Sequence, residues 1–104
     1  MNTWKTVGQA DPVAATPVTA YTVPAATQFV GSVRVANRGA ATAFRVWVAL
    51  NGAGDANPQY LAFDKAIGAN DTDEVLVVAD AADLVRVYAT LATLSFNVRG
   101  VEKT

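Results

Sequence analysis

Apolar and polar residues alternate along most of the chain from residue 18 onward, which is the period of half-buried β-strands. The clearest run is AFRVWVAL (43–50), where one side of the strand is wholly apolar and the other carries Arg45 and Trp47. The residues that this alternation assigns to the core are Phe29, Gly31, Val33, Val35, Phe44, Val46, Val48, Leu50, Val85, Val87, Ala89, Leu94, Phe96 and Val98.

Short turns rich in Gly, Asn, Asp and Pro separate about seven predicted strands. Their expected bounds are 18–23, 28–37, 42–51, 59–64, 73–79, 84–90 and 93–101. No segment supports more than one helical turn. Many short strands with such turns predict an all-β fold, an antiparallel β-sandwich or a jelly-roll-like barrel.

Residues 1–17 differ from the rest, because Pro12 and Pro17 interrupt them and Trp4 and Val7 stand isolated among small and polar residues. We therefore predict an extended N-terminal arm over 1–17, outside the core, and one β-sandwich domain over 18–104. A tryptophan buries about 200 Å² when it docks. We expect Trp4 to anchor the arm on a neighbouring subunit rather than on its own domain.

The amino-acid composition limits the kinds of partner that the chain can have. The chain has 104 residues, 52% hydrophobic and 16% charged, which suits one packed domain with a thinly charged surface. Eight Lys and Arg against nine Asp and Glu give a formal charge of −1, so we expect no nucleic-acid partner. No run approaches the roughly 20 apolar residues of a membrane span, and no secretion signal opens the chain, so we expect synthesis in the cytoplasm and no membrane partner.

The sequence contains few residues that could act in catalysis or bind a metal. The sequence contains neither cysteine nor histidine, and its only serines, Ser32 and Ser95, fall in the middle of predicted strands. We therefore expect no enzyme and no cofactor. Asp71, Asp73 and Glu74 offer oxygen ligands for calcium but lack the spacing of a full calcium loop, so we interpret them as a solvated turn and expect no metal site.

Four predicted strands each place one arginine on the side away from the core. Trp, Tyr and Arg are enriched where proteins dock, and an outward tryptophan is seldom left in water. The candidate interface residues are Trp4, Val7, Arg34, Arg45, Trp47, Arg86, Tyr88 and Arg99. The alternative is an ordinary surface on which the arginines pair with acids such as Asp64 or Glu74.

A carbohydrate-binding module is a more distant alternative, because aromatic rings on a sandwich face can stack on sugars. It needs two or three coplanar, exposed rings. The available rings are Trp4, Trp47, Tyr88, Tyr21 and Tyr60, which are scattered along the sequence, so protein docking is the better interpretation.

Seven short motifs follow one another from residue 21 to residue 102. They are YTVPA (21–25), NRG (37–39), FR (44–45), YLAFD (60–64), NDT (70–72), SFN (95–97) and GVE (100–102). In this order they resemble a family of small virion proteins of tailed bacteriophages and prophages. The chain departs from that pattern at Val101, where the family commonly has an aromatic residue.

The resemblance implies a structural, non-enzymatic role in the virion, with the major capsid protein or tail proteins as partners. A sparsely charged surface and an extended N-terminal arm suit a protein that binds across neighbouring subunits of a capsid lattice. We therefore expect a capsid decoration (cement) protein that forms a homo-oligomer. A tail, neck or baseplate component is the close alternative.

Overall fold

The computed structural model describes residues 4–103, apart from the burial of residues 52 and 57, and confirms an all-β fold. The strands are β1 Lys5–Ala10, β2 Val18–Thr22, β3 Gln28–Asn37, β4 Thr42–Ala49, β5 Tyr60–Ile67, β6 Thr72–Ala79, β7 Leu84–Ala89 and β8 Leu94–Lys103. Two short 3-10 turns, η1 Leu50–Gly52 and η2 Asn57–Gln59, lie between β4 and β5. Within the described part of the chain, no helix is long and apolar enough to cross a membrane.

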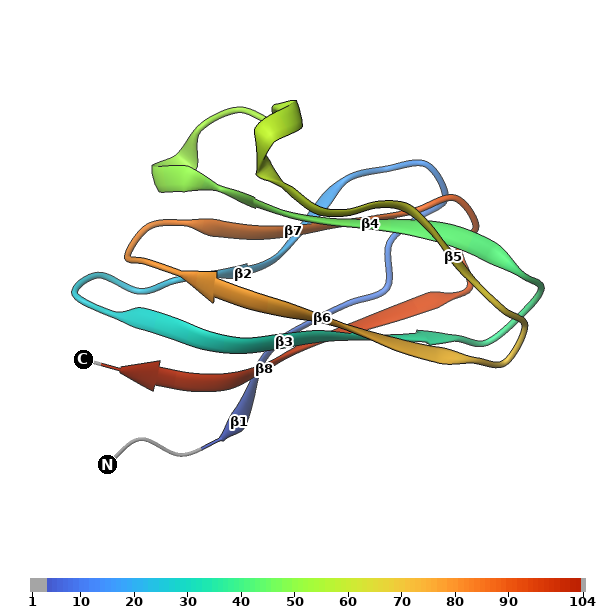
Figure 1. The fold of residues 1–104 in the computed structure, drawn as a ribbon, viewed down its shortest axis with the longest axis horizontal. Coiled ribbons are helices and arrows are strands. Elements are labelled where there is room, and N and C mark those ends of the chain that lie inside the picture. The colour runs from blue at the N-terminus through green and yellow to red at the C-terminus, as the bar shows by residue number, and fades with distance from the viewer. Residues whose placement is uncertain (1–3, 104) are drawn as a thin grey trace.

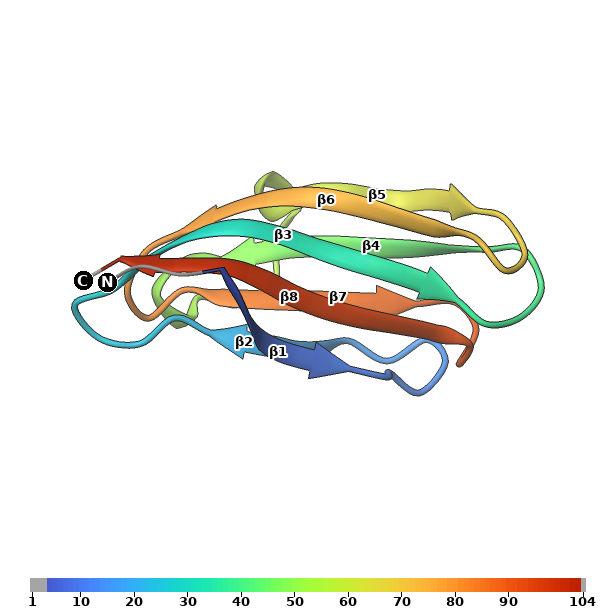
Figure 2. The same ribbon diagram turned by 90° about the horizontal axis from the view of Figure 1, so that it is seen from below.

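The strands form two antiparallel four-stranded sheets packed face to face (Figure 1). Sheet A has the order β1-β8-β3-β6 and sheet B the order β2-β7-β4-β5. Figure 2 shows sheet A in front, with β6 at its upper edge and β1 at its lower edge. Only β4 and β5 are neighbours both in the chain and in a sheet, which is the strand order of an eight-stranded jelly roll.

The structure has eight strands rather than the expected seven, and the additional one is β1. It lies within residues 1–17, the predicted arm, and pairs with β8 from Lys5 opposite Gly100 to Ala10 opposite Phe96. Its sequence, KTVGQA, has only one large apolar residue, so its local pattern does not predict a strand. The segment forms a strand because its backbone pairs with the edge of β8. Its own sequence does not show that this pairing partner is available.

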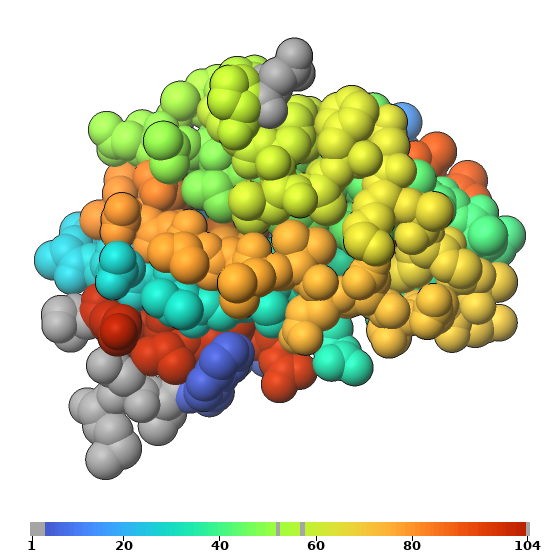
Figure 3. Space-filling view, in the orientation of Figure 1, coloured from blue at the N-terminus to red at the C-terminus, as the bar shows by residue number. Residues whose placement is uncertain are grey.

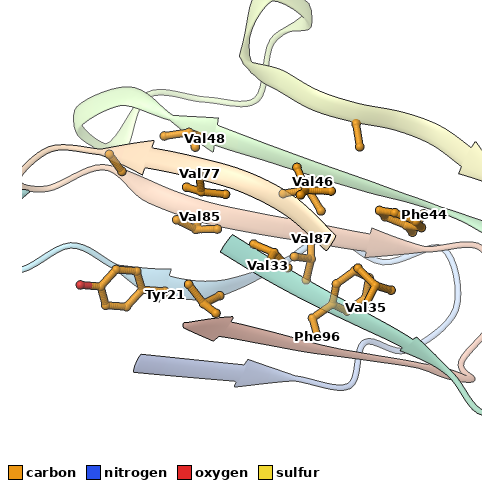
Figure 4. Packing of buried hydrophobic residues seen from close by; sticks show 14 of the residues in the cluster. Tyr21, Val33, Val35, Phe44, Val46, Val48, Val77, Val85, Val87 and Phe96 are labelled. Carbon is orange, nitrogen blue, oxygen red and sulfur yellow. The ribbon is translucent and has the colours of Figure 1, made fainter. Parts of the chain in front are cut away.

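The core lies between the two sheets (Figure 4). It contains the predicted inward side chains of β3, β4, β7 and β8, together with side chains of β2, β5 and β6 that the prediction did not assign to it. Phe29, Phe44 and Phe96 are fully buried. The rings of Phe44 and Phe96 meet edge to face with their centroids 6.2 Å apart, which joins β4 to β8 across the sandwich. Leu50 is the exception to the prediction, because β4 ends at Ala49 and the 3-10 turn leaves the Leu50 side chain 63% exposed.

Asn37 holds together three turns at one end of the sandwich. Its buried amide nitrogen donates to the carbonyl oxygens of Ala40 (2.8 Å) and Gly68 (2.9 Å). Its side-chain oxygen accepts from the Gly39 amide and the Thr93 hydroxyl, each at 3.0 Å. A single side chain therefore links the β3–β4, β5–β6 and β7–β8 connections.

Candidate docking surfaces

The structure distributes the candidate interface residues over two opposite faces of the sandwich. Strands β4 and β7 place Arg45, Trp47, Arg86 and Tyr88 on the outer face of sheet B. Strands β3 and β8 place Arg34 and Arg99 on the outer face of sheet A. Trp4 and Val7 lie at β1, on the edge of sheet A. The set is not one continuous surface, and the two faces have different chemistry.

Arg45 is the centre of an aromatic–arginine cluster on sheet B, which comprises Arg45, Trp47, Tyr60, Phe63, Arg86 and Tyr88. The guanidinium carbon of Arg45 lies 4.2 Å from the ring centroid of Phe63 and 4.5 Å from that of Tyr88. Its Nε donates to Asp64 Oδ1 at 2.7 Å and its Nη2 to Asp64 Oδ2 at 3.3 Å. The hydrogen bond to the Asp64 carboxylate raises the pKa of Arg45, whose guanidinium group also makes cation–π contacts with both rings.

A β-bulge in β5 brings Phe63 and Asp64 to the same arginine. The pairing register of β4 and β5 shifts between Phe44 and Val46, and Asp64 adopts a φ of 49°. A left-handed conformation is tolerated by Asp better than by most residues, and a bulge redirects side chains from simple alternation. Strict period two does not describe β5, so the alternation gives no signal for Phe63 as a site residue.

Trp47 faces outward from sheet B, as the alternation predicts, but it is only 1% exposed. The loop between β4 and β5, at the top of Figure 1, lies on this side of the sandwich. Asp55 in that loop accepts a hydrogen bond from Trp47 Nε1 at 2.8 Å and two from Arg86 Nη1 at 3.0 and 2.9 Å. The ring of Tyr60 is 5.2 Å away. The expectation that Trp47 presents a large area to a partner is thus corrected, because the chain covers it.

Phe63 is the most exposed ring of the aromatic–arginine cluster. Its side chain is 55% exposed, and Leu61 in the same strand is 49% exposed. The ring of Tyr60 meets that of Phe63 edge-on, with centroids 4.8 Å apart and planes at 84°. The accessible apolar area of the cluster is therefore concentrated on β5.

The outer face of sheet A carries an aliphatic strip, defined as Val30, Leu76, Val78 and Val101. Val30 of β3 lies opposite Val78 of β6 and Val101 of β8. Leu76 is 75% exposed and Val78 is 59% exposed. Arg34 and Arg99 are exposed beside the strip, and neither forms an ion pair with any residue that the structure describes.

Trp4 and Val7 have opposite environments at β1. Trp4 is 64% exposed, so it does not cover its own sandwich. Val7 is partly buried and packs against the core cluster, which makes it a core residue rather than a free contact. Next to Trp4, Lys5 Nζ lies 2.9 Å from Glu102 Oε1, and the Glu102 carboxylate also accepts a hydrogen bond from the Tyr21 hydroxyl.

The carboxylates of the acidic turn, Asp71, Asp73 and Glu74, bind groups of the same chain. Lys65 Nζ lies 2.7 Å from Asp73 Oδ2, and the hydrogen bond from this ammonium group lowers the pKa of Asp73. Glu74 Oε2 accepts from the Ser32 hydroxyl at 2.7 Å, and Asp71 accepts from the Thr72 amide at 2.8 Å. Within residues 4–103, the acidic side chains form no group of three or more that could hold a metal ion.

A shallow hollow of about 430 Å³ lies between the ends of β1 and β8. Two of the polar side chains that line it already bond each other, because Gln9 Nε2 donates to Asn97 Oδ1 at 2.8 Å. A third, Asp11, accepts a hydrogen bond from Arg38 at 2.8 Å. The hollow therefore offers few free polar groups to a ligand.

No protein-family model matches this sequence, and no curated protein is significantly similar to it. The family resemblance of the seven motifs consequently stays a prediction.

Proposed function

We propose that the protein is a non-enzymatic structural component of a tailed-phage virion and acts as a capsid decoration (cement) protein. The ordered series of motifs between residues 21 and 102 supports this assignment by resemblance. The jelly-roll fold is compatible with it, but the same fold also serves lectins and cupins, so the fold alone selects no function.

The observation that carries the proposal is the aromatic–arginine cluster. Arg45 is fixed by Asp64 and two rings, and Arg86 is fixed by the Asp55 carboxylate. Groups that are ordered before a partner arrives lose little conformational entropy on docking. The few residues that supply most of the binding energy at protein interfaces are also enriched in Trp, Tyr and Arg. The cluster therefore has the composition and rigidity of a protein-docking surface, with Phe63 as its accessible ring.

A tail, neck or baseplate component remains the close alternative, because the same cluster would dock on any virion protein of complementary shape. Sugar binding has less support. Tyr21 and Trp47 are buried, with 7% and 1% of their surfaces exposed, and the rings of Tyr60 and Phe63 are nearly perpendicular rather than coplanar. A coplanar platform for a sugar ring is therefore absent from the aromatic–arginine cluster.

Rebinding to particles tests the proposal. Capsids purified from a phage that lacks the gene are mixed with the purified chain, and bound protein is measured by sedimentation. We expect saturable binding that Phe63→Ala weakens about tenfold, or about 1.4 kcal/mol, because the exposed ring is lost. Val13→Ala is the matched control, since Val13 is 71% exposed in a loop outside the aromatic–arginine cluster.

Three outcomes would count against the proposal. Binding of Phe63→Ala as tightly as the wild type would exclude the cluster as the docking surface. Binding to purified tails but not to capsids would replace decoration with a tail role. Saturable binding of a glycan, lost in Phe63→Ala, would support the sugar-binding alternative.

A further inference from the structure

Three of the four sheet edges in this molecule carry features that discourage pairing with another strand. Strand β1 has a register shift between Thr6 and Gly8, and β2 has one between Thr19 and Tyr21. Strand β5 has two register shifts against β4. Bulges of this kind twist an edge away from new partners.

Strand β6 is the fourth edge, and its charged residues, Asp73 and Glu74, are confined to its start. It pairs with β3 over eight consecutive residues without a register shift. Its sequence, TDEVLVVA, contains no Pro, Gly, Lys or Arg. Two of its outward side chains, Leu76 and Val78, are 75% and 59% exposed. A long, regular and apolar edge strand is a template for pairing with another chain.

The free side of β6 is accessible over most of its length. Figure 3 looks onto the β5–β6 side of the molecule, and no described segment lies over the orange surface of β6. At the start of the strand, Asp73 is held by Lys65 of β5, which brings the two edges together there. The accessible part of the strand is therefore Glu74 to Ala79.

We propose that β6 pairs antiparallel with β6 of a second copy of this chain, joining two copies of sheet A into one eight-stranded sheet. The charge distribution of the strand favours this occupant. The acids lie at the start of β6 and the apolar residues at its end, so an antiparallel pair separates the two acidic segments. A parallel pair would place them side by side, where like charges repel.

The same reasoning selects a register. A two-fold axis perpendicular to the sheet keeps outward residues opposite outward residues. With Leu76 opposite Leu76 of the second copy, each Glu74 faces Val78. A shift by two residues in one direction would place Glu74 opposite Asp80, and a shift in the other direction would place the two Glu74 residues diagonally across the pair, so both shifts bring like charges together. The expected dimer therefore has the two Leu76 side chains in contact at its centre, with the aliphatic strips of both copies adjoining.

A cysteine at the centre of the interface tests the register directly. The chain contains no cysteine, so an introduced thiol is the only one. Opposed residues in an antiparallel pair have Cα atoms about 4.5–5.5 Å apart, within the range of about 4.4–6.8 Å that a disulfide spans. Leu76→Cys should form a covalent dimer of twice 10.8 kDa under mild oxidation. Val13→Cys is the matched control, because Val13 is also exposed (71%) but lies in the loop after β1, the edge of sheet A opposite to β6.

The association itself is measured by sedimentation equilibrium of the full chain. A single pair of strands buries less surface than a standard interface, so we expect a concentration-dependent dimer with a Kd in the micromolar range, between about 1 μM and 1 mM. Leu76→Lys should leave a monomer with an unchanged thermal midpoint, because the side chain is on the surface. Val13→Lys should dimerise as the wild type does.

Equal cross-linking of the two cysteine variants would overturn the proposal. So would a wild-type chain that stays monomeric up to about 1 mM, or a Leu76→Lys variant that still dimerises. The inference is independent of the proposed virion role, because none of these measurements involves a phage particle.

Discussion

The two tryptophans of this chain show how environment, rather than residue type, determines a contribution to stability. Trp47 is 1% exposed and donates to Asp55, whereas Trp4 is 64% exposed. We expect Trp47→Ala to lower the free energy of unfolding by about 3–5 kcal/mol, because it leaves a cavity beneath the β4–β5 loop. Trp4→Ala should change it by less than about 0.5 kcal/mol. Urea denaturation measures both, and similar losses for the two variants would contradict the structure.

The Glu102 carboxyl group makes the free energy of unfolding depend on pH. The hydrogen bond from Tyr21, followed by that from Lys5, lowers the pKa of Glu102 from its ordinary value of 4.5. A carboxyl group whose pKa is depressed by folding stabilises the folded state above its ordinary pKa, and this contribution is lost as the pH falls through the folded-state value. The stability of the wild type should therefore decrease below about pH 4.5.

Glu102→Gln tests the origin of that decrease. The variant does not titrate at position 102, so its free energy of unfolding should fall less between about pH 5 and pH 3 than that of the wild type. Tyr21→Phe, which removes the largest cause of the shift, should flatten the curve in the same direction. An acid-induced loss as steep in both variants as in the wild type would show that other carboxylates are responsible.

At the scale of the strand, the close contact of β3 with β8 depends on two facing glycines. Gly31 lies opposite Gly100, and a Cβ atom on Gly31 would lie 2.1 Å from the Arg99 carbonyl oxygen and 2.6 Å from the Gly100 Cα. Backbone atoms cannot move aside as a flexible side chain can. We expect Gly31→Ala to lower the free energy of unfolding by more than about 2 kcal/mol.

Gly54→Ala is the matched control for this substitution, because a Cβ atom there would meet no other atom within 4 Å. Thermal unfolding should separate the two variants clearly. Equal midpoints would mean that β3 and β8 can move apart without loss.

Sequence alternation predicted the strands whose two sides differ strongly, and β3 has the expected bounds of 28–37. It missed β1 because KTVGQA becomes a strand only by pairing with β8. It placed Leu50 in the core because the left-handed conformation of Asn51, with a φ of 50°, has no signal in the alternation. These errors occur where tertiary contacts or backbone turns override local periodicity.

The alternation predicted the candidate site only in part, because it places side chains on one side of a strand but does not describe loops or bulges. Arg45, Arg86 and Tyr88 were correctly placed on the outer side of their strands. The coverage of Trp47 by Asp55 was not predictable, because it depends on how a long loop folds back. Phe63 was not predictable either, since the bulge at Asp64 interrupts the period of two.

At the scale of the whole molecule, the two outer faces offer different contacts. The outer face of sheet B carries the aromatic–arginine cluster, and the outer face of sheet A ends in the unprotected edge of β6. A dimer through β6 would leave both copies of the cluster free, so one dimer could contact two sites on a lattice. This arrangement would raise the overall affinity for an ordered surface without any new contact.

Electron cryomicroscopy of intact virions that carry this chain tests the proposed function most directly. We predict repeated density on the head lattice that fits the eight-stranded sandwich, with the outer face of sheet B and Phe63 turned toward the shell. Density for the chain on the tail alone, or the absence of the chain from purified particles, would contradict the assignment as a capsid decoration protein.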